Sequence, residues 1–187
     1  MTAKCRIPAN DKIFVLLSRF NLQWHIMNEK EIKTLYREYE NTSELSDSER
    51  MLVESAADAA AKAYAPYSHF MVGAAILLDD GTIVTGANVE NAAFPSGSCA
   101  EKTALSYSVS NFPDRFPVAI AITAISNGKI TSEPVPPCGN CRQMLLEEEL
   151  RTGKHFRVIL AGKEKIFVLD SCGSLMPLQF NKSNLNR

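Results

Sequence analysis

Two sets of cysteines in this 187-residue chain have the residue types and spacing that bind a metal ion. Cys138 and Cys141 form a C-x-x-C motif directly after two prolines, and Cys99 stands two residues before Glu101. Both sets stand where a helix is expected to begin, and the N–H groups and positive dipole end of a helix start favour thiolate over thiol. Sulfurs at positions i and i+3 can point the same way and share one ion. The three cysteines are therefore candidate zinc ligands.

Three protein ligands leave the fourth corner of a tetrahedral Zn²⁺ ion for water, which is typical of a catalytic zinc. Zinc lowers the pKa of such a water toward ~7. Glu101 is close enough to Cys99 in sequence to reach this water without binding the metal. A carboxylate there can take the water proton, protonate a ring nitrogen and deliver a proton to departing ammonia. C-x-E followed by P-C-x-x-C matches the signature of zinc-dependent base deaminases.

Other interpretations of the cysteines stay open at this point. A C-x-x-C motif alone also occurs in redox pairs and in structural zinc sites, which would make the protein a redox or non-catalytic module. A closed structural site would need Cys5, Cys172 or His69 as its fourth ligand, and none of these has paired ligand spacing. The added C-x-E motif favours the metal-dependent hydrolase.

The flanking sequence predicts the elements that must position these residues. Ser46 and Glu49 form a capping box before an apolar stripe, Asp79-Asp80-Gly81 is a hairpin turn, and continuous apolar runs indicate buried strands. The expected elements are a helix from Ser46 to about Tyr64, strands at Phe70–Leu78 and Ile83–Val89, a helix at Cys99–Ser110, a strand at Val118–Ile125, a helix at Gly139–Leu150, and strands at Phe156–Ala161 and Ile166–Leu169. This order predicts an α/β sandwich, with helices covering a mixed sheet.

We divide the chain into an N-terminal extension, residues 1–45, and a catalytic domain, residues 46–187. The extension is expected to be partly helical, because Asn28 followed by Glu31 indicates a helix start. Apolar residues then follow on one face of that helix, namely Ile32, Leu35, Tyr36 and Tyr39.

The composition excludes some classes of partner. Hydrophobic residues make up 45% of the chain and charged residues 22%, with a formal net charge of −1. This charge gives no electrostatic footprint for a nucleic acid or an anionic membrane. The longest early apolar run, Ile13 to Leu17, is too short to span a membrane and lacks a secretory cleavage pattern. We therefore expect a cytoplasmic protein with reduced cysteines and a small, weakly charged substrate.

From about Ser46 to Phe180 the sequence resembles the cytidine deaminase family. The matching segments are Ala65–Phe70, Val72–Ala75, Asn88–Asn91, Cys99–Glu101 and Pro137–Gln143. The resemblance implies a three-layer α/β/α fold around a five-stranded mixed sheet and one Zn²⁺ per subunit. It also implies hydrolysis of cytidine and deoxycytidine to uridine and deoxyuridine in pyrimidine salvage.

The resemblance assigns roles to several substrate-binding residues. Asn88 and Glu90 correspond to the pair that binds the ribose 3′-hydroxyl, and alternate positions of a strand do face the same side. Phe70 corresponds to the ring that packs against the pyrimidine, and the backbone of Ala100 to the group that contacts the base edge.

The chain is also similar to the three-cysteine branch of the family, whose members are homotetramers with shared active sites. By this similarity Ala92, Phe94 and Phe180 would complete the site of a neighbouring subunit. Phe180 could instead cover its own core.

Two positions differ from the family pattern. Lys102 stands where an arginine usually offsets the charge of the three thiolates, and a lysine cannot form the same forked hydrogen bonds. Lys102 would reach one sulfur at most, with Arg142 sharing the task, and we expect a different pKa for the zinc-bound water. Phe94 replaces a tyrosine, which removes one hydrogen bond to the ribose 5′-oxygen.

Deaminases for other substrates are the remaining competitors. A deaminase of an aminoglycosyl-cytosine antibiotic or of a different base is disfavoured by Asn88 and Glu90, which suit a ribose hydroxyl. A deaminase of tRNA or single-stranded DNA would be expected to carry a basic track and an aromatic platform, and neither accompanies these motifs.

Overall fold

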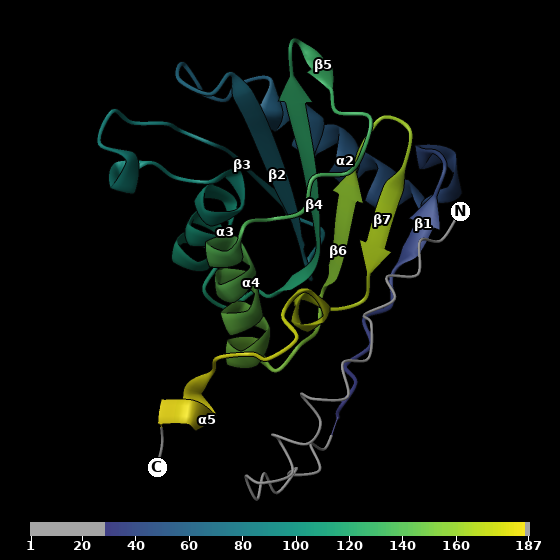
Figure 1. Ribbon diagram of the computed structural model, residues 1–187, viewed down its shortest axis with the longest axis vertical. Helices are drawn as coiled ribbons and strands as arrows, with labels where there is room; N and C mark the ends of the chain where they lie inside the picture. Colours follow the sequence, from purple (N-terminus) through teal and green to yellow (C-terminus); the bar gives the residue numbers. More distant parts are fainter. Residues whose placement is uncertain (1–28, 186–187) are drawn as a thin grey trace, which may run out of the picture. The chain divides into compact units, whose positions relative to one another are not determined.

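In the computed structural model, which describes residues 29–185, a seven-stranded sheet forms the centre of the molecule (Figure 1). Its strands lie in the order β1-β7-β6-β4-β2-β3, and β5 pairs with β4. The strands are β1 (Arg37–Tyr39), β2 (Phe70–Leu78), β3 (Ile83–Ala87), β4 (Pro117–Ser126), β5 (Lys129–Ile130), β6 (Arg157–Ala161) and β7 (Ile166–Leu169). The helical elements are α2 (Asp47–Ala60), α3 (Ala100–Asn111), α4 (Gly139–Thr152), α5 (Lys182–Leu185) and the short 3-10 helices η1 (Thr42–Glu44), η2 (Phe94–Ser96) and η3 (Cys172–Leu175).

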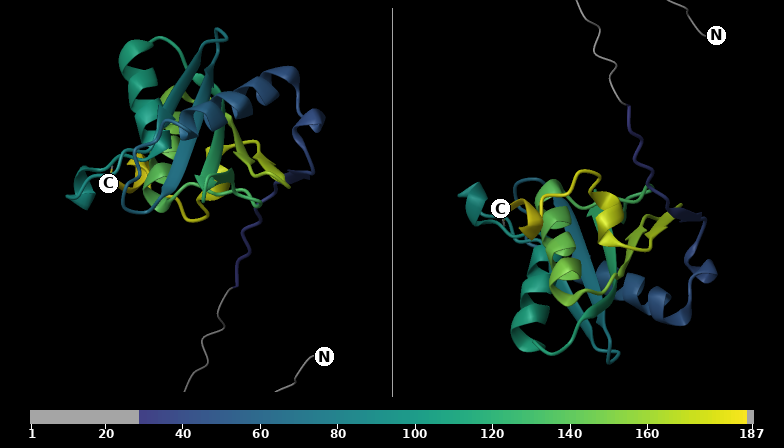
Figure 2. Two further views of the ribbon diagram at one scale, coloured as in Figure 1. Left: turned by 90° about the horizontal axis from the view of Figure 1, so that it is seen from above. Right: turned by 90° about the horizontal axis from the view of Figure 1, so that it is seen from below.

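Helices cover both faces of the sheet, as the fold prediction requires (Figures 1 and 2). Leu52, Val53 and Ala56 of α2 pack with Ala75 and Ala121 in one buried cluster. A second buried cluster, on the opposite face of the strands, joins α3 and α4 to the sheet through residues that include Ala100, Ala104, Leu145, Ile76 and Ile122. Alternate residues of a strand point to opposite faces, so β2 and β4 contribute to both clusters.

The topology brings the starts of α3 and α4 to one edge of the sheet. Strands β3 and β4 both run antiparallel to β2, so they run in the same direction. Helix α3 connects β3 to β4, and α4 connects β4 to its parallel neighbour β6. Each helix therefore starts near the carboxyl end of the strand before it, which is where α/β folds place their sites.

Two glycines let the helices approach the sheet closely. A Cβ on Gly73 of β2 would lie 2.0 Å from the carbonyl oxygen of Ala56 in α2. A Cβ on Gly86 of β3 would lie 2.4 Å from the backbone nitrogen of Ala104 and 2.6 Å from the carbonyl oxygen of Ala100. Any side chain at either position would push a helix away, so these glycines fix the depth at which α2 and α3 sit.

Helix α2 begins as expected and ends earlier. Ser46 and Glu49 form the predicted capping box, with the Ser46 backbone nitrogen donating to Glu49 Oε2 at 3.0 Å. The helix stops at Ala60 rather than near Tyr64. The backbone nitrogen of Tyr64 donates instead to the carbonyl oxygen of Asn88 at 3.0 Å, so the segment after α2 pairs with the residues that follow β3.

The prediction of a helix that starts after Asn28 is wrong for the described residues. Asn28 lies outside them, residues 30–36 form no helix, and Arg37–Tyr39 pair antiparallel with β7. The Arg37 guanidinium binds Asp170 with two hydrogen bonds of 2.7 and 2.8 Å, and the Tyr36 ring lies 4.8 Å from that of Phe167. These long-range contacts outweigh the local helical pattern.

The sheet has seven strands rather than five. All five expected strands are present as β2, β3, β4, β6 and β7, and β1 and β5 extend the sheet. Both additions are two or three residues long, too short to give a periodic sequence signal. Residues 1–28 of the predicted extension lie outside the described part, and among the described residues no helix is long and apolar enough to cross a membrane.

Candidate active site

Three cysteine sulfurs converge where α3 and α4 begin. The Sγ atoms of Cys99, Cys138 and Cys141 all lie within 4.8 Å of one another. Cys99 is the N-cap of α3, Cys138 is the N-cap of α4, and Cys141 lies in the first turn of α4. A tetrahedral ion with Zn–S bonds of ~2.3 Å holds its sulfurs roughly 4 Å apart, so the cluster suits Zn²⁺.

No further ligand joins this cluster among residues 29–185. His69 and Cys172, the fourth ligands that a closed structural site would use, are not part of it, and Cys5 lies outside the described residues. The three cysteines and Cys172 are all free thiols rather than disulfides. A three-sulfur set with an open corner is the arrangement of a catalytic metal site.

The electrostatics of the three thiols call for a cation. Burial raises the pKa of Cys99. Burial and the neighbouring Glu101 carboxylate raise the pKa of Cys141. Burial also acts on Cys138, but hydrogen bonds from the backbone N–H groups of Cys141 and Asn140 bring the pKa of Cys138 below its ordinary value. Three thiolates beside a carboxylate repel one another, and a divalent cation removes that cost.

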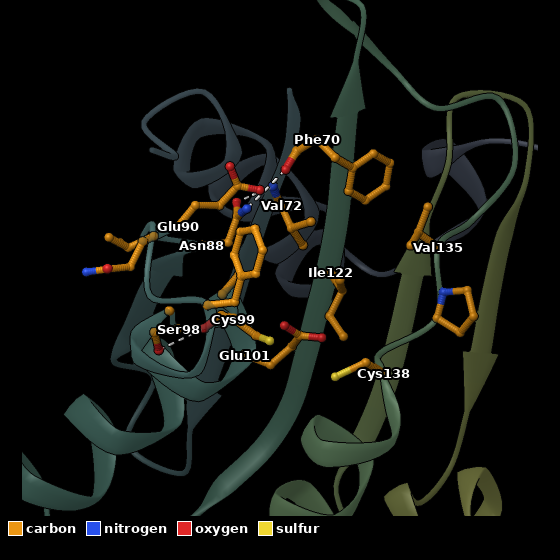
Figure 3. Close-up of a pocket in the computed structure, with 16 residues that line it drawn as sticks. Phe70, Val72, Asn88, Glu90, Ser98, Cys99, Glu101, Ile122, Val135 and Cys138 are labelled. Atoms are coloured by element: carbon orange, nitrogen blue, oxygen red, sulfur yellow. Dashed lines mark hydrogen bonds between the residues drawn. The ribbon is translucent and has the colours of Figure 1, made fainter. Parts of the chain in front are cut away.

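Glu101 lies in the first turn of α3, with only 5% of its surface exposed. Burial raises the pKa of its carboxyl group, against hydrogen bonds from its own backbone N–H and from Cys141. In Figure 3 the carboxyl group lies between Cys99 and Cys138. A raised pKa makes the carboxylate a better proton acceptor, which suits a group that takes up a proton and returns it.

A cavity of about 470 Å³ opens beside Glu101 (Figure 3). One wall is apolar, and Asn88 and Glu90 provide polar groups on the other side (Figure 3). The apolar lining includes Phe70, Val72, Ile122, Val135 and Pro136. A largely apolar cavity with a few polar groups is typical of a small-molecule site.

Asn88 is held by the first residues of β2, and Glu90 is held by the loop that leads into β2. The Asn88 side chain accepts from Val72 N at 2.7 Å and donates to the carbonyl oxygen of Phe70 at 3.0 Å. Glu90 Oε2 accepts from the backbone nitrogens of Tyr67 and Ser68, at 2.9 and 3.2 Å. Both side chains are therefore fixed in orientation before any ligand binds.

The structure gathers most of the predicted site residues in one place. Phe70, Asn88, Glu90, Phe94, Cys99, Ala100, Glu101 and Cys138 line the cavity, and Cys141 lies behind it in the sulfur cluster. Ala92 and Phe180 are exposed and do not line it. The carbonyl oxygen of Phe180 accepts from Gln143 Nε2 at 3.0 Å, and 56% of Phe180 is exposed.

Neither Lys102 nor Arg142 offsets the charge of the sulfurs through a hydrogen bond. The Lys102 side chain is exposed and makes no hydrogen bond or ion pair within the described part of the chain. Arg142 Nε donates to the carbonyl oxygen of Pro137 at 2.8 Å, and its Nη1 to that of Leu175 at 3.2 Å. Arg142 thus fixes the residue before Cys138 rather than a sulfur, which differs from the expectation.

Several lining residues were absent from the sequence prediction. Val135 and Pro136 lie in the loop before α4, and Ile122 lies on the expected strand β4. A strand residue such as Ile122 has the same pattern as any core residue, so no local signal separates it. The Pro136-Pro137 pair was the one available sign that this loop is rigid.

Comparison with known proteins shows the family. Residues 46–154 match the family model described as the cytidine and deoxycytidylate deaminase zinc-binding region. The chain belongs to this zinc-binding deaminase family. With the three-cysteine cluster, this match gives the protein one bound Zn²⁺ as its cofactor. The prediction of a zinc-dependent deaminase is confirmed at the level of the family.

Individual members of the family are similar to this chain over much of their length. The cytidine deaminase of Halalkalibacterium halodurans is 48% identical over 98 residues, which are 52% of this chain and 70% of that protein. The cytidine deaminase of Sporosarcina psychrophila is 46% identical over 101 residues, 54% of this chain and 69% of that protein. The crystal structure of cytidine deaminase from Burkholderia pseudomallei has a TM-score of 0.60 at 36% identity, covering 70% of this chain and 97% of that one.

Proposed function

We propose that the protein hydrolyses cytidine and deoxycytidine to uridine and deoxyuridine with release of ammonia. The observation that carries the proposal is the position of Glu101, buried beside three converging sulfurs at a cavity of about 470 Å³. Cys99, Cys138 and Cys141 would hold the Zn²⁺ ion. When bound, zinc supplies a water molecule of lowered pKa.

Glu101 moves the protons of the reaction. Its carboxylate accepts a proton as water adds to C4 of the pyrimidine and delivers it to the ring nitrogen N3. It then takes the proton of the new C4 hydroxyl and transfers it to the departing amino group, which leaves as ammonia while the C4 carbonyl forms. One water is consumed and one ammonia is released, so Glu101 ends in its starting state. Burial of the carboxyl group suits this role, because a raised pKa allows both directions of transfer.

The remaining residues orient the nucleoside. Phe70 packs against the pyrimidine, and the backbone of Ala100 contacts the edge of the base. Asn88 and Glu90 bind the ribose 3′-hydroxyl, and both line the cavity. Their fixed positions favour a sugar-bearing substrate over free cytosine, since free cytosine leaves these polar groups without a ligand. The same argument disfavours an antibiotic with an altered sugar.

We also propose a homotetramer with shared active sites. The segment that carries Ala92 and Phe94 stands away from the sheet (Figure 1), and 76% of Phe94 is exposed although it borders its own cavity. Leu178 is 91% exposed, close in sequence to Phe180. Of these, Phe94 is an exposed apolar side chain at the rim of a site, a position that suits an interface. A cytoplasmic location stays a prediction.

Sedimentation equilibrium and mixing of variants test the assembly. We expect a mass four times that of one chain. Phe94→Ala and Glu101→Gln subunits, each weakly active alone, should regain activity when unfolded and refolded together, because a mixed assembly contains some sites with both residues intact. A monomer with wild-type activity would contradict the shared site.

An ultraviolet assay of cytidine loss with an ammonia measurement tests the reaction. Glu101→Gln should keep its zinc and lose at least about 10²-fold in kcat, the usual contribution of a general acid–base. Glu147→Gln is the matched control, because Glu147 is an exposed glutamate of α4. Zinc-loaded wild-type protein that leaves cytidine intact would refute the proposal, as would a fully active Glu101→Gln.

A further inference from the structure

We propose that Ser68 is a positioning residue that fixes the Glu90 carboxylate for the hydroxyl of the substrate's sugar. The inference rests on the proposed function and adds a residue to its binding site. Ser68 precedes His69 and Phe70 in the loop before β2, and it does not itself line the cavity. It acts through Glu90, which does.

The Ser68 hydroxyl lies between two groups of the site. It donates its single hydrogen to Glu90 Oε1 and accepts from the backbone nitrogen of Phe70 at 3.0 Å. A hydroxyl has one hydrogen to donate, and here the carboxylate takes it. The contact therefore joins the sugar-binding carboxylate to the start of the strand that carries the aromatic ring of Phe70.

Asn88 and Glu90 keep some hydrogen-bond positions that no group among residues 29–185 occupies, and these are available to a ligand. Glu90 Oε2 already accepts from two backbone N–H groups, those of Tyr67 and Ser68. Glu90 Oε1 accepts from the Ser68 hydroxyl and keeps one acceptor position. The Asn88 amide uses one of its two N–H hydrogens on the Phe70 carbonyl oxygen and keeps the other. One donor therefore remains on Asn88 Nδ2 and one acceptor position on Glu90 Oε1, which suit a single hydroxyl group, and Asn88 Oδ1 keeps a further acceptor position beside Val72 N.

The backbone conformation supports this arrangement. His69 has φ of 55°, in the left-handed region that residues other than glycine rarely adopt. Its backbone nitrogen donates to the carbonyl oxygen of Ala65 at 3.0 Å, which closes the turn. This turn lets Ser68 face Glu90 while Phe70 enters β2. Strained residues of this kind cluster at functional sites.

The hydrogen bond from the Ser68 hydroxyl also favours the ionised form of the Glu90 carboxyl group. The Ser68 hydroxyl is the main reason that the pKa of Glu90 lies below its ordinary value, with the Tyr67 N–H next. Glu90 thus stays ionised and accepts hydrogen bonds only, as the position count requires.

Steady-state kinetics of zinc-loaded Ser68→Ala, Ser68→Thr and Ser110→Ala protein test the role. Ser110 is the matched control, because its hydroxyl donates only to Ser106 O within the exposed end of α3. Each protein is assayed with cytidine and with 3′-deoxycytidine, which lacks the hydroxyl that Glu90 would bind. Zinc content and circular dichroism are measured for each variant.

With cytidine, Ser68→Ala should lose about tenfold in kcat/KM, mostly through KM, as expected for a weakened hydrogen bond to a charged group. With 3′-deoxycytidine the same variant should lose less than about twofold, because the contact is already missing. Ser68→Thr keeps the hydroxyl and should stay within about threefold of wild type with cytidine. Ser110→Ala should match wild type with both substrates.

Three results would overturn the positioning role while wild-type protein still releases ammonia from cytidine. These are wild-type kinetics in Ser68→Ala, an equal loss with both substrates, and a wild-type protein that does not distinguish the two substrates. If Ser68→Ala does not keep its fold and zinc, Ser68→Cys carries the same comparison, since a thiol is a weaker donor of similar size. Absence of turnover in wild-type protein would instead refute the proposed function.

Discussion

The side-chain amide of Asn88 donates to the carbonyl oxygen of Phe70 at 3.0 Å, so a residue after β3 holds the first residue of β2. Its Oδ1 also accepts from Val72 N at 2.7 Å. The two bonds add to the backbone bond from Asn88 N to Val72 O, 3.1 Å long, just after β3 ends. Asn88 is thus part of the sheet as well as of the cavity.

Asn88→Ala should therefore reduce stability as well as substrate binding. We expect the free energy of unfolding to fall by about 1–3 kcal/mol, because two backbone groups of β2 lose their partners. Asn88→Asp keeps the acceptor for Val72 N but loses the donor to Phe70. Its free energy of unfolding should therefore lie between those of Asn88→Ala and the wild type. Chemical denaturation and the KM for cytidine measure both effects. Unchanged stability in Asn88→Ala would contradict the structural part of this role.

Gly86→Ala and Gly73→Ala form a matched pair. Each should destabilise the fold by about 1–3 kcal/mol or more, because the new Cβ would overlap the backbone of a helix. Gly86 lies under α3, beside Ala100 and Ala104, so its variant should also lower zinc content and kcat. Gly73 lies under α2 on the other face, so its variant should lose stability with a smaller loss of zinc. Equal zinc retention in the two variants would contradict this division.

Arg142 and Lys102 provide a second comparison. Arg142→Ala removes the hydrogen bonds to Pro137 O and Leu175 O, and we expect a loss of about 1–3 kcal/mol in stability together with weaker zinc retention. Lys102→Ala removes an exposed side chain, and its stability should change by less than about 0.5 kcal/mol. Thermal unfolding with and without a chelator measures both. A Lys102→Ala protein that loses zinc faster than Arg142→Ala would contradict the expectation.

The pH dependence of stability should carry a contribution from Glu90. Its pKa in the folded protein is lowered by the Ser68 hydroxyl and by the Tyr67 N–H. The stabilisation is therefore fully present above the unfolded pKa of about 4.3 and is lost as the pH falls through the folded value. The difference in unfolding free energy between wild type and Glu90→Gln should be constant from pH 7 to about 5 and should shrink below about 4.3. A difference that persists unchanged to pH 3 would count against this contribution.

The sequence alone was sufficient for the chemistry and for most of the elements. The C-x-E and C-x-x-C spacings are local signals. A helix start favours thiolates that can bind a metal ion, so Cys99, Cys138 and Cys141 could be predicted as one set of ligands. The capping box at Ser46 and the apolar runs of the five longer strands are also local signals, and the structure contains all of them.

Tertiary structure decided what depends on residues far apart in the chain. Strand β1 pairs with β7, and its Arg37 binds Asp170, 133 residues away, although the local pattern predicts a helix. Ser68 binds Glu90 across 22 residues, and no motif marks a serine as the partner of a carboxylate. Lys102 follows the buried Glu101 directly, yet its side chain is exposed, because a helix turns successive side chains in different directions. Local spacing fixes which groups can react, and only packing fixes which groups hold them in place.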